Sequence, residues 1–255
     1  MHNTGLRVLS IFLSLYLYEG DFISTSKIFE LLSFSMCEAR RIREQGYPLQ
    51  VYDVTGTSLS PPRYDYQYIF PFPVILSHHR VACYLWLKQQ GLKGLPVIYF
   101  DAHHNVFGSK DVVQSSNWVR AVLREGLSPS ALWVPPKWLE KEEEDFKFLA
   151  SKIYLQGLNL ILVDDLEKLP SGSELGPVVV SIDCDYFSSI DPFHQAKREE
   201  VQEEIRRIIE VLKEKGIKIA ALNISISPGY TTLGLEGFIK EELLKAFSQY
   251  GDGEE

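Results

Sequence analysis

Short, almost wholly apolar runs that alternate with helical segments constrain the fold of this chain most strongly. Residues 96–100 (PVIYF) and 178–182 (VVVSI) are the clearest such runs, and both are too short for a core helix. Helical periodicity follows or separates them, most clearly over residues 196–215. Strands that are buried on both faces and separated by helices are typical of a parallel sheet. The sequence therefore predicts a three-layer α/β/α fold with a mainly parallel central sheet.

The rest of the chain extends the same alternation. We expect further strands at residues 49–54, 70–76, 132–134, 159–163 and 217–226, and helices at residues 24–44, 78–90, 117–125, 139–149 and 196–215. No internal repeat divides the sequence. Its 255 residues are 45% hydrophobic, which suffices for one large core. We expect a single domain over residues 1–255.

Composition excludes several classes of partner. The net charge is −8, and clustered basic residues do not appear outside short helical stretches, which argues against nucleic-acid binding. The apolar run at residues 6–18 contains Arg7 and is shorter than the roughly 20 residues of a membrane span, so no membrane association is expected. This run is either a buried element or a leader. The three cysteines, Cys37, Cys83 and Cys184, are odd in number and far apart, which favours a reducing, cytoplasmic location.

Two of the buried runs end directly in acidic clusters. Residues 96–100 run into DAHHN, and residues 178–182 run into DCD. The carboxyl ends of parallel strands form the edge where open sheets bind ligands. Residues two apart in extended chain share a side, so Asp101 groups with His103 and Asn105, and Asp183 groups with Asp185.

These side chains predict a metal site. Three carboxylates and an imidazole in apolar surroundings would repel one another unless a cation lay among them. Oxygen-rich donors with a histidine suit Mn²⁺, with Fe²⁺ or Zn²⁺ as alternatives. Cys184 should point to the opposite side from its neighbours and pack in the core. The competing interpretation is that strand-end Asp residues only cap the following turns.

A third polar cluster, His78 and His79, follows the apolar run PVIL. One imidazole could complete a metal shell while the other hydrogen-bonds substrate or water. As ordinary loop residues they would have no such role.

The sequence contains, in order along the chain, the motifs SHHR, DAHHN and SIDCD, followed by Asp191-Pro192. Together these motifs resemble those of the arginase–agmatinase (ureohydrolase) superfamily, which shares its fold with the histone deacetylases. The resemblance covers roughly residues 70–230 in pattern. The first motif runs on to Ala82 and Trp86, as in some arginase-like proteins. The resemblance implies that Asp101 and Asp183 bridge two metals. His103 and Asp185 would hold one ion, and His79 with the residue at 105 would hold the other.

Three departures from the superfamily pattern matter. Asn105 stands where the superfamily has Asp, which should weaken one of the two metals, so one or two ions are expected. The Asp191-Pro192 pair is displaced by about three residues. The residues that read the guanidinium or amino-acid end of the substrate in arginases have no clear counterpart, so arginine is not supported as the substrate.

The favoured function is hydrolysis of a C–N bond, of amide or guanidino type, in a small molecule by a metal-activated water. His78 could shuttle the proton, and Tyr230 in the segment SPGYTT could donate a hydrogen bond to a developing oxyanion, although a turn residue is the alternative. A binding or scaffold protein that has lost activity and a metal phosphoesterase are the competing hypotheses. Assembly into a homo-oligomer is left open.

Overall fold

The computed structural model of this chain describes residues 47–52, 65–77, 83–84, 87–88, 92–107, 113–114, 116–139, 157–191 and 193–250, with the backbone alone over residues 47–52 and 65–69. No helix within these ranges is long and apolar enough to cross a membrane.

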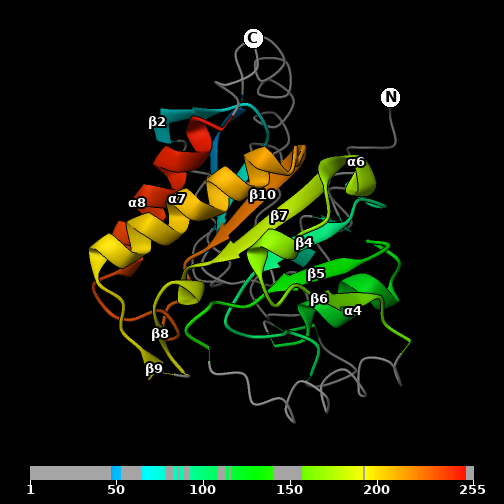
Figure 1. The fold of residues 1–255 in the computed structure, drawn as a ribbon, viewed down its shortest axis with the longest axis horizontal. Helices are drawn as coiled ribbons and strands as arrows, with labels where there is room; N and C mark the ends of the chain where they lie inside the picture. The colour runs from blue at the N-terminus through cyan, green and yellow to red at the C-terminus, as the bar shows by residue number, and fades with distance from the viewer. Residues whose placement is uncertain are drawn as a thin grey trace, which may run out of the picture.

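An eight-stranded sheet with the order β2-β1-β3-β10-β7-β4-β5-β6 organises the described chain (Figure 1). Its strands are β1 (Tyr47–Tyr52), β2 (Asp65–Phe70), β3 (Val74–Ser77), β4 (Val97–Phe100), β5 (Ala131–Val134), β6 (Leu160–Leu162), β7 (Val178–Asp183) and β10 (Ile219–Ser225). Only β2 pairs antiparallel, with β1, and every other pairing is parallel. The predicted, mainly parallel sheet is confirmed.

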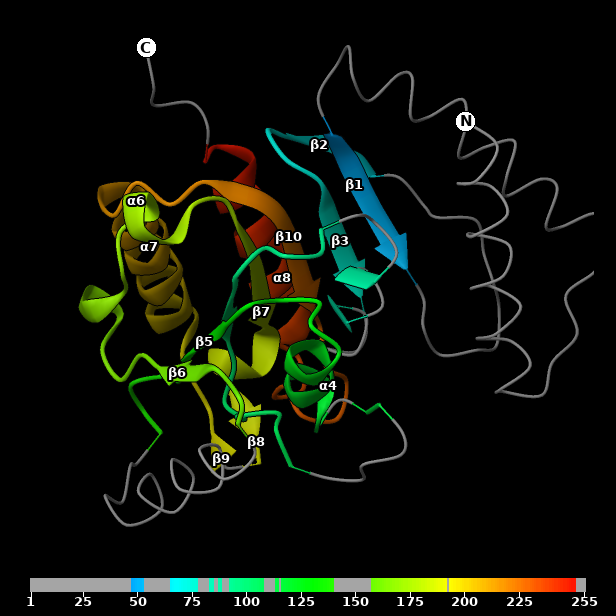
Figure 2. The same cartoon turned by 90° about the vertical axis from the view of Figure 1, so that its right-hand side faces the viewer.

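Helices cover both faces of the sheet. Helices α7 (Arg198–Glu214) and α8 (Glu236–Ser248) lie on one face and α4 (Trp118–Arg124) on the other, as Figure 2 shows. Side chains along β4 alternate between the two cores: Ile98 and Phe100 face α7 and α8, whereas Val97 and Tyr99 face α4. The predicted three-layer α/β/α fold is confirmed.

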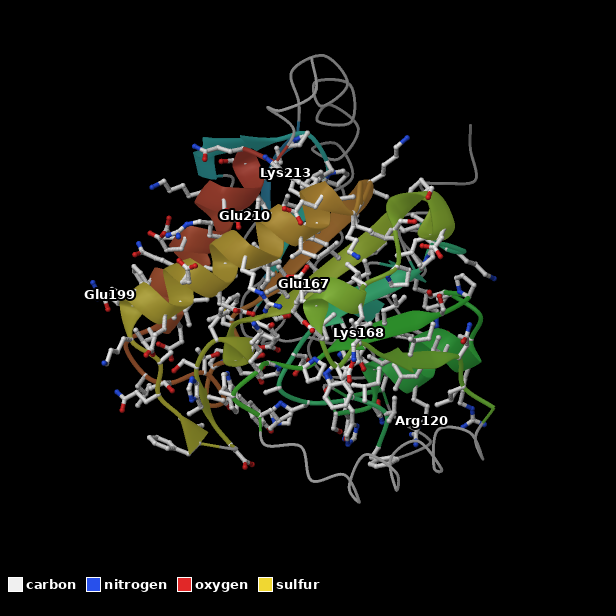
Figure 3. The ribbon with its side chains drawn as sticks, viewed as in Figure 1. Arg120, Glu167, Lys168, Glu199, Glu210 and Lys213 are labelled. Atoms are coloured by element: carbon white, nitrogen blue, oxygen red, sulfur yellow. The ribbon has the colours of Figure 1, made fainter. Side chains whose placement is uncertain are left out.

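Helix α7 is amphipathic, as its sequence pattern predicts. Val201, Ile205, Ile208 and Leu212 are buried at helical spacing against the sheet. The opposite face is charged and exposed, and Figure 3 shows its labelled members, Glu199, Glu210 and Lys213. At the first turn, the backbone N–H of Lys197 donates to the carboxylate of Glu200 at 2.8 Å, which caps the helix.

Most predicted elements in the described ranges are confirmed to within about two residues. The single strand expected at residues 70–76 is wrong: β2 ends at Phe70, β3 begins at Val74, and a bend separates them. Pro71 and Pro73 explain the break, because a proline cannot donate to a strand ladder. The helix expected at 78–90 is helical at the four described residues, while those at 24–44 and 139–149 lie outside the described residues, apart from Leu139.

Several short elements were not predicted. They are η1 (Leu166–Lys168), α6 (Gly172–Leu175), η2 (Cys184–Tyr186), β8 (Ser189–Ile190) and β9 (Phe193–His194). Strands β8 and β9 form an antiparallel hairpin beyond the end to which the β7 arrow points in Figure 1.

Strand register brings the ends of the central strands level. Phe100 in β4 pairs with Ile182 in β7, so that Asp101 follows one strand beside Asp183 at the end of the other. On the far side of β7, Asp183 pairs with Ser225 of β10. The acidic clusters predicted at two strand ends therefore share one edge of the sheet.

Candidate metal centre

Asp101, His103 and Asp185 converge at this edge. Each offers one ligand atom, and these atoms all lie within 4.8 Å of one another. The His103 Nδ1 atom is 3.0 Å from Asp185 Oδ2 and 3.4 Å from Asp101 Oδ1. Asp101 and Asp185 are 2% and 0% exposed, whereas His103 is part-exposed and forms the open side of the group.

Two similar turns hold these ligands in place. The backbone N–H of His103 donates to Asp101 Oδ1 at 2.8 Å, and the backbone N–H of Asp185 donates to Asp183 Oδ1 at 3.1 Å. In both turns, a strand-end aspartate accepts from the residue two positions later. The strand-end aspartates therefore do cap turns, and these caps aim His103 and Asp185 at each other. The extended geometry expected for Asp183 and Asp185 is wrong, because Asp185 lies in η2.

Asp183 is buried beside the group of three. Its Oδ2 atom accepts a hydrogen bond from Ser227 Oγ at 2.6 Å. The sequence did not single out Ser227. Its φ of 50° is uncommon for a serine, and its carbonyl accepts from the backbone N–H groups of Tyr230 and Thr231. The Ser-Pro-Gly turn after a buried strand was the available signal.

Asn105 turns its amide nitrogen toward the centre. Its Nδ2 atom lies 2.6 Å from Asp101 Oδ2 and 3.0 Å from the His103 carbonyl oxygen. Both neighbours are acceptors, so hydrogen bonding requires the nitrogen on this side. The residue is buried and has a φ of 56°, a region that Asn tolerates better than most residues. Its predicted role as a ligand stays a prediction.

Tyr230 lies at the open side of the centre. Its ring meets the His103 ring edge-on, with centroids 5.7 Å apart, and the residue is 43% exposed. The Tyr230 carbonyl accepts from the Ile190 backbone N–H at 2.8 Å, which ties its loop to the β8–β9 hairpin. The structure thus places the Tyr230 ring next to a candidate ligand, and its predicted role as a hydrogen-bond donor stays a prediction.

The two neighbouring histidines have opposite electrostatics. Burial lowers the pKa of His103, but the hydrogen bonds and charges of Asp101 and Asp185 outweigh it and raise the pKa to about 10. Burial, followed by the charge of His103, lowers the pKa of His104 to about 4. The His104 ring packs edge-on against Phe107 and accepts from the Val106 N–H, so it belongs to the supporting structure.

The other predicted site residues have different outcomes. His78 and His79 lie outside the described residues. Cys184 is fully buried in the core on the α7 side, as expected, and burial raises its thiol pKa well above the usual range. Asp191 is exposed in the β8–β9 turn, where its backbone N–H bonds Ser189 Oγ.

The donor set fits a divalent cation. Two buried carboxylates and one imidazole converge. The raised pKa of His103 indicates that the two carboxylates stabilise a positive charge placed next to them. Oxygen donors with one imidazole are the ligand types that Mn²⁺, Fe²⁺ and Zn²⁺ accept.

The fold is that of the solved ureohydrolases. The chain is similar to formimidoylglutamase from Bacillus subtilis, with a TM-score of 0.50, 17% identity, and 71% of this chain and 61% of that chain covered. It is also similar to a candidate agmatinase from Clostridium difficile, with a TM-score of 0.50, 18% identity and coverages of 72% and 69%. The match thus spans about three fifths of the formimidoylglutamase. A scan against protein families and a search of curated proteins find no match.

Proposed function

We propose that this chain is a metal-dependent hydrolase that cleaves a C–N bond of amide or guanidino type in a small molecule. The convergence of Asp101, His103 and Asp185 at the carboxyl ends of β4 and β7 carries the proposal. Ligands bind at this edge in open parallel sheets. The solved structures of the same fold include a formimidoylglutamase, a name that refers to a substrate with a C–N bond, and this supports the reaction class.

In this proposal, Asp101, His103 and Asp185 hold the cation, with Mn²⁺ preferred over Fe²⁺ and Zn²⁺. A bound divalent cation supplies Lewis acidity and a water of lowered pKa. The turns closed by Asp101 and Asp183 keep the ligands preorganised. Tyr230, beside His103, donates a hydrogen bond to the oxygen or nitrogen on which negative charge develops.

The test is hydrolysis by purified protein that has been stripped with EDTA and reloaded with Mn²⁺. A panel of guanidino and amide compounds is assayed for release of urea or ammonia, and a generic phosphate ester is assayed for phosphate. Release of urea or ammonia that disappears with EDTA and returns with Mn²⁺ is expected. Cleavage of the phosphate ester alone would instead identify a phosphoesterase.

A second candidate is a binding or scaffold protein that keeps the fold without the reaction. The amide of Asn105 favours it, because a neutral donor faces Asp101 where a further carboxylate would strengthen cation binding. Mn²⁺ binding without turnover of any compound in the panel would support this candidate over the hydrolase.

A further inference from the structure

We infer that this centre holds a single divalent cation, because Asn105 and Ser227 use the outer carboxylate oxygens that a second cation would need. The inference rests on the proposed function for the existence of a metal, and goes beyond it by fixing the number of ions. It is carried by two hydrogen bonds from different parts of the chain.

The first is the bond from Asn105 to Asp101. Asp101 Oδ1 faces the group of three and also accepts the His103 N–H, while Oδ2 is 2.6 Å from Asn105 Nδ2. An amide nitrogen is a donor only and gives no electron pair to a cation. The same nitrogen donates to the His103 carbonyl, so reversing the amide would set its oxygen against two acceptors.

The second is the bond from Ser227 to Asp183. Asp183 Oδ1 accepts the Asp185 N–H, and Oδ2 accepts the Ser227 hydroxyl at 2.6 Å. Ser227 holds this position with a φ of 50°, which is costly for a non-glycine residue. The Tyr230 and Thr231 N–H groups fix its carbonyl. The donor is therefore held at Asp183 by the backbone around it.

The balance of buried charge at the centre is consistent with one divalent cation. Asp101, Asp183 and Asp185 are all buried, and one divalent cation offsets two of their three negative charges. Neutral donors from Asn105, Ser227 and the backbone stabilise the remaining charge. A carboxylate in place of the Asn105 amide would face Asp101 and the His103 carbonyl without a donor, and would need a second cation between them.

The experiment measures metal stoichiometry, which is independent of turnover. Protein is stripped with EDTA, incubated with Mn²⁺ and freed of excess metal, and Mn per chain is determined by elemental analysis and native mass spectrometry. Wild type is expected to bind one Mn²⁺. The double variant Asn105→Asp/Ser227→Ala, which replaces one donor by a carboxylate and removes the other, is expected to double this to two, whereas Ser227→Ala alone, which loses a donor without gaining a ligand, stays at one.

Electron paramagnetic resonance on the wild type is a second measurement of the number of ions, and it tests the inference even if the double variant fails to fold. The wild type is expected to give the signal of an isolated Mn²⁺ ion, and the double variant should give the exchange-coupled signal of a close pair. Two ions in the wild type, or one ion in the folded double variant, would overturn the inference and leave the proposed hydrolase intact. No bound Mn²⁺ in any variant would overturn the hydrolase as well.

Discussion

Asp185 is fully buried, and its carboxylate lies 3.0 Å from the His103 imidazole. Asp185→Asn keeps the shape of the side chain and removes the charge. We expect the Kd for Mn²⁺ to rise by about tenfold or more, measured by isothermal titration calorimetry. Asp191→Asn is the matched control, because it makes the same change in an exposed turn and should leave the Kd unchanged. Equal Kd values for D185N and wild type would remove Asp185 from the centre.

Tyr230→Phe removes one hydroxyl and keeps the ring that contacts His103. If this hydroxyl stabilises developing charge, kcat should fall by about 100-fold while KM and the Mn²⁺ Kd stay close to wild type. A fall confined to KM would indicate substrate binding instead. An unchanged kcat would leave Tyr230 as a turn residue.

The buried thiol of Cys83 should make the stability of the protein depend on pH. Burial, partly offset by a hydrogen bond with Ser181, raises its thiol pKa from 9.0 to about 12. Between these values the unfolded chain loses the proton and the folded chain keeps it, so stability falls as pH rises above 9. Urea unfolding between pH 9 and pH 11 should show a smaller decline in Cys83→Ala, by up to about 1.4 kcal/mol per pH unit. Parallel declines in the two proteins would contradict the raised pKa.

For the residues of the candidate metal centre, the sequence predicted which residue types take part, but it did not predict most of their contacts. Asp101, His103 and Asp185 could be predicted because buried strands run directly into them. Ser227 could not, since its partner Asp183 is 44 positions away and only the sheet brings them together. The direction of the Asn105 amide also depends on folded neighbours. The roles of His78 and His79 stay predictions.

Among the elements, α6 lies in close backbone contact with the turn that follows α7. Gly172 in α6 donates its backbone N–H to the Lys215 carbonyl, just past the end of α7, at 2.7 Å. A Cβ on Gly172 would overlap the carbonyl oxygen of Gly216. Only glycine permits this approach of the two backbones.

Gly172→Ala should therefore lower the free energy of unfolding by about 1 to 3 kcal/mol, measured by urea denaturation. Gly237→Ala is the control: Gly237 lies in α8 with open space around its Cα, and alanine there should stabilise by up to about 1 kcal/mol. Equal effects of the two substitutions would show that α6 can move away from α7.

Sequence patterns predicted the long or fully apolar elements and failed on the short ones. Strand β4 is an unbroken apolar run, and helix α7 carries strong helical periodicity over its whole length. Strands β8 and β9 have two residues each, too few for any period, and Ser189 in β8 also bridges to Thr231 in the loop that follows β10. The split between β2 and β3 was signalled by Pro71 and Pro73, which the apolar pattern outweighed.

For the molecule as a whole, metal binding should be coupled to folding. The ligands come from segments after β4 and β7 and meet only in the native sheet. Saturating Mn²⁺ should therefore raise Tm, with about 2.7 kcal/mol of added stability when free Mn²⁺ is 100 times Kd. Differential scanning calorimetry with Mn²⁺ and with EDTA measures the shift. No shift in wild type would contradict a preformed cation site.

Strand β10 is the last strand of the described chain and lies in the middle of the sheet. Until it is synthesised, β1 to β3 form one group and β4 to β7 another, and no pairing in the described sheet joins them. Ser77 and Asn223, which hydrogen-bond across β3 and β10, are 146 residues apart. Such long-range closure is slow, and it leaves apolar strand edges exposed on the ribosome. The edges of β3 and β7 that β10 later covers, the second of them next to the metal ligands, are therefore open to mispairing and to a chaperone in a nascent chain.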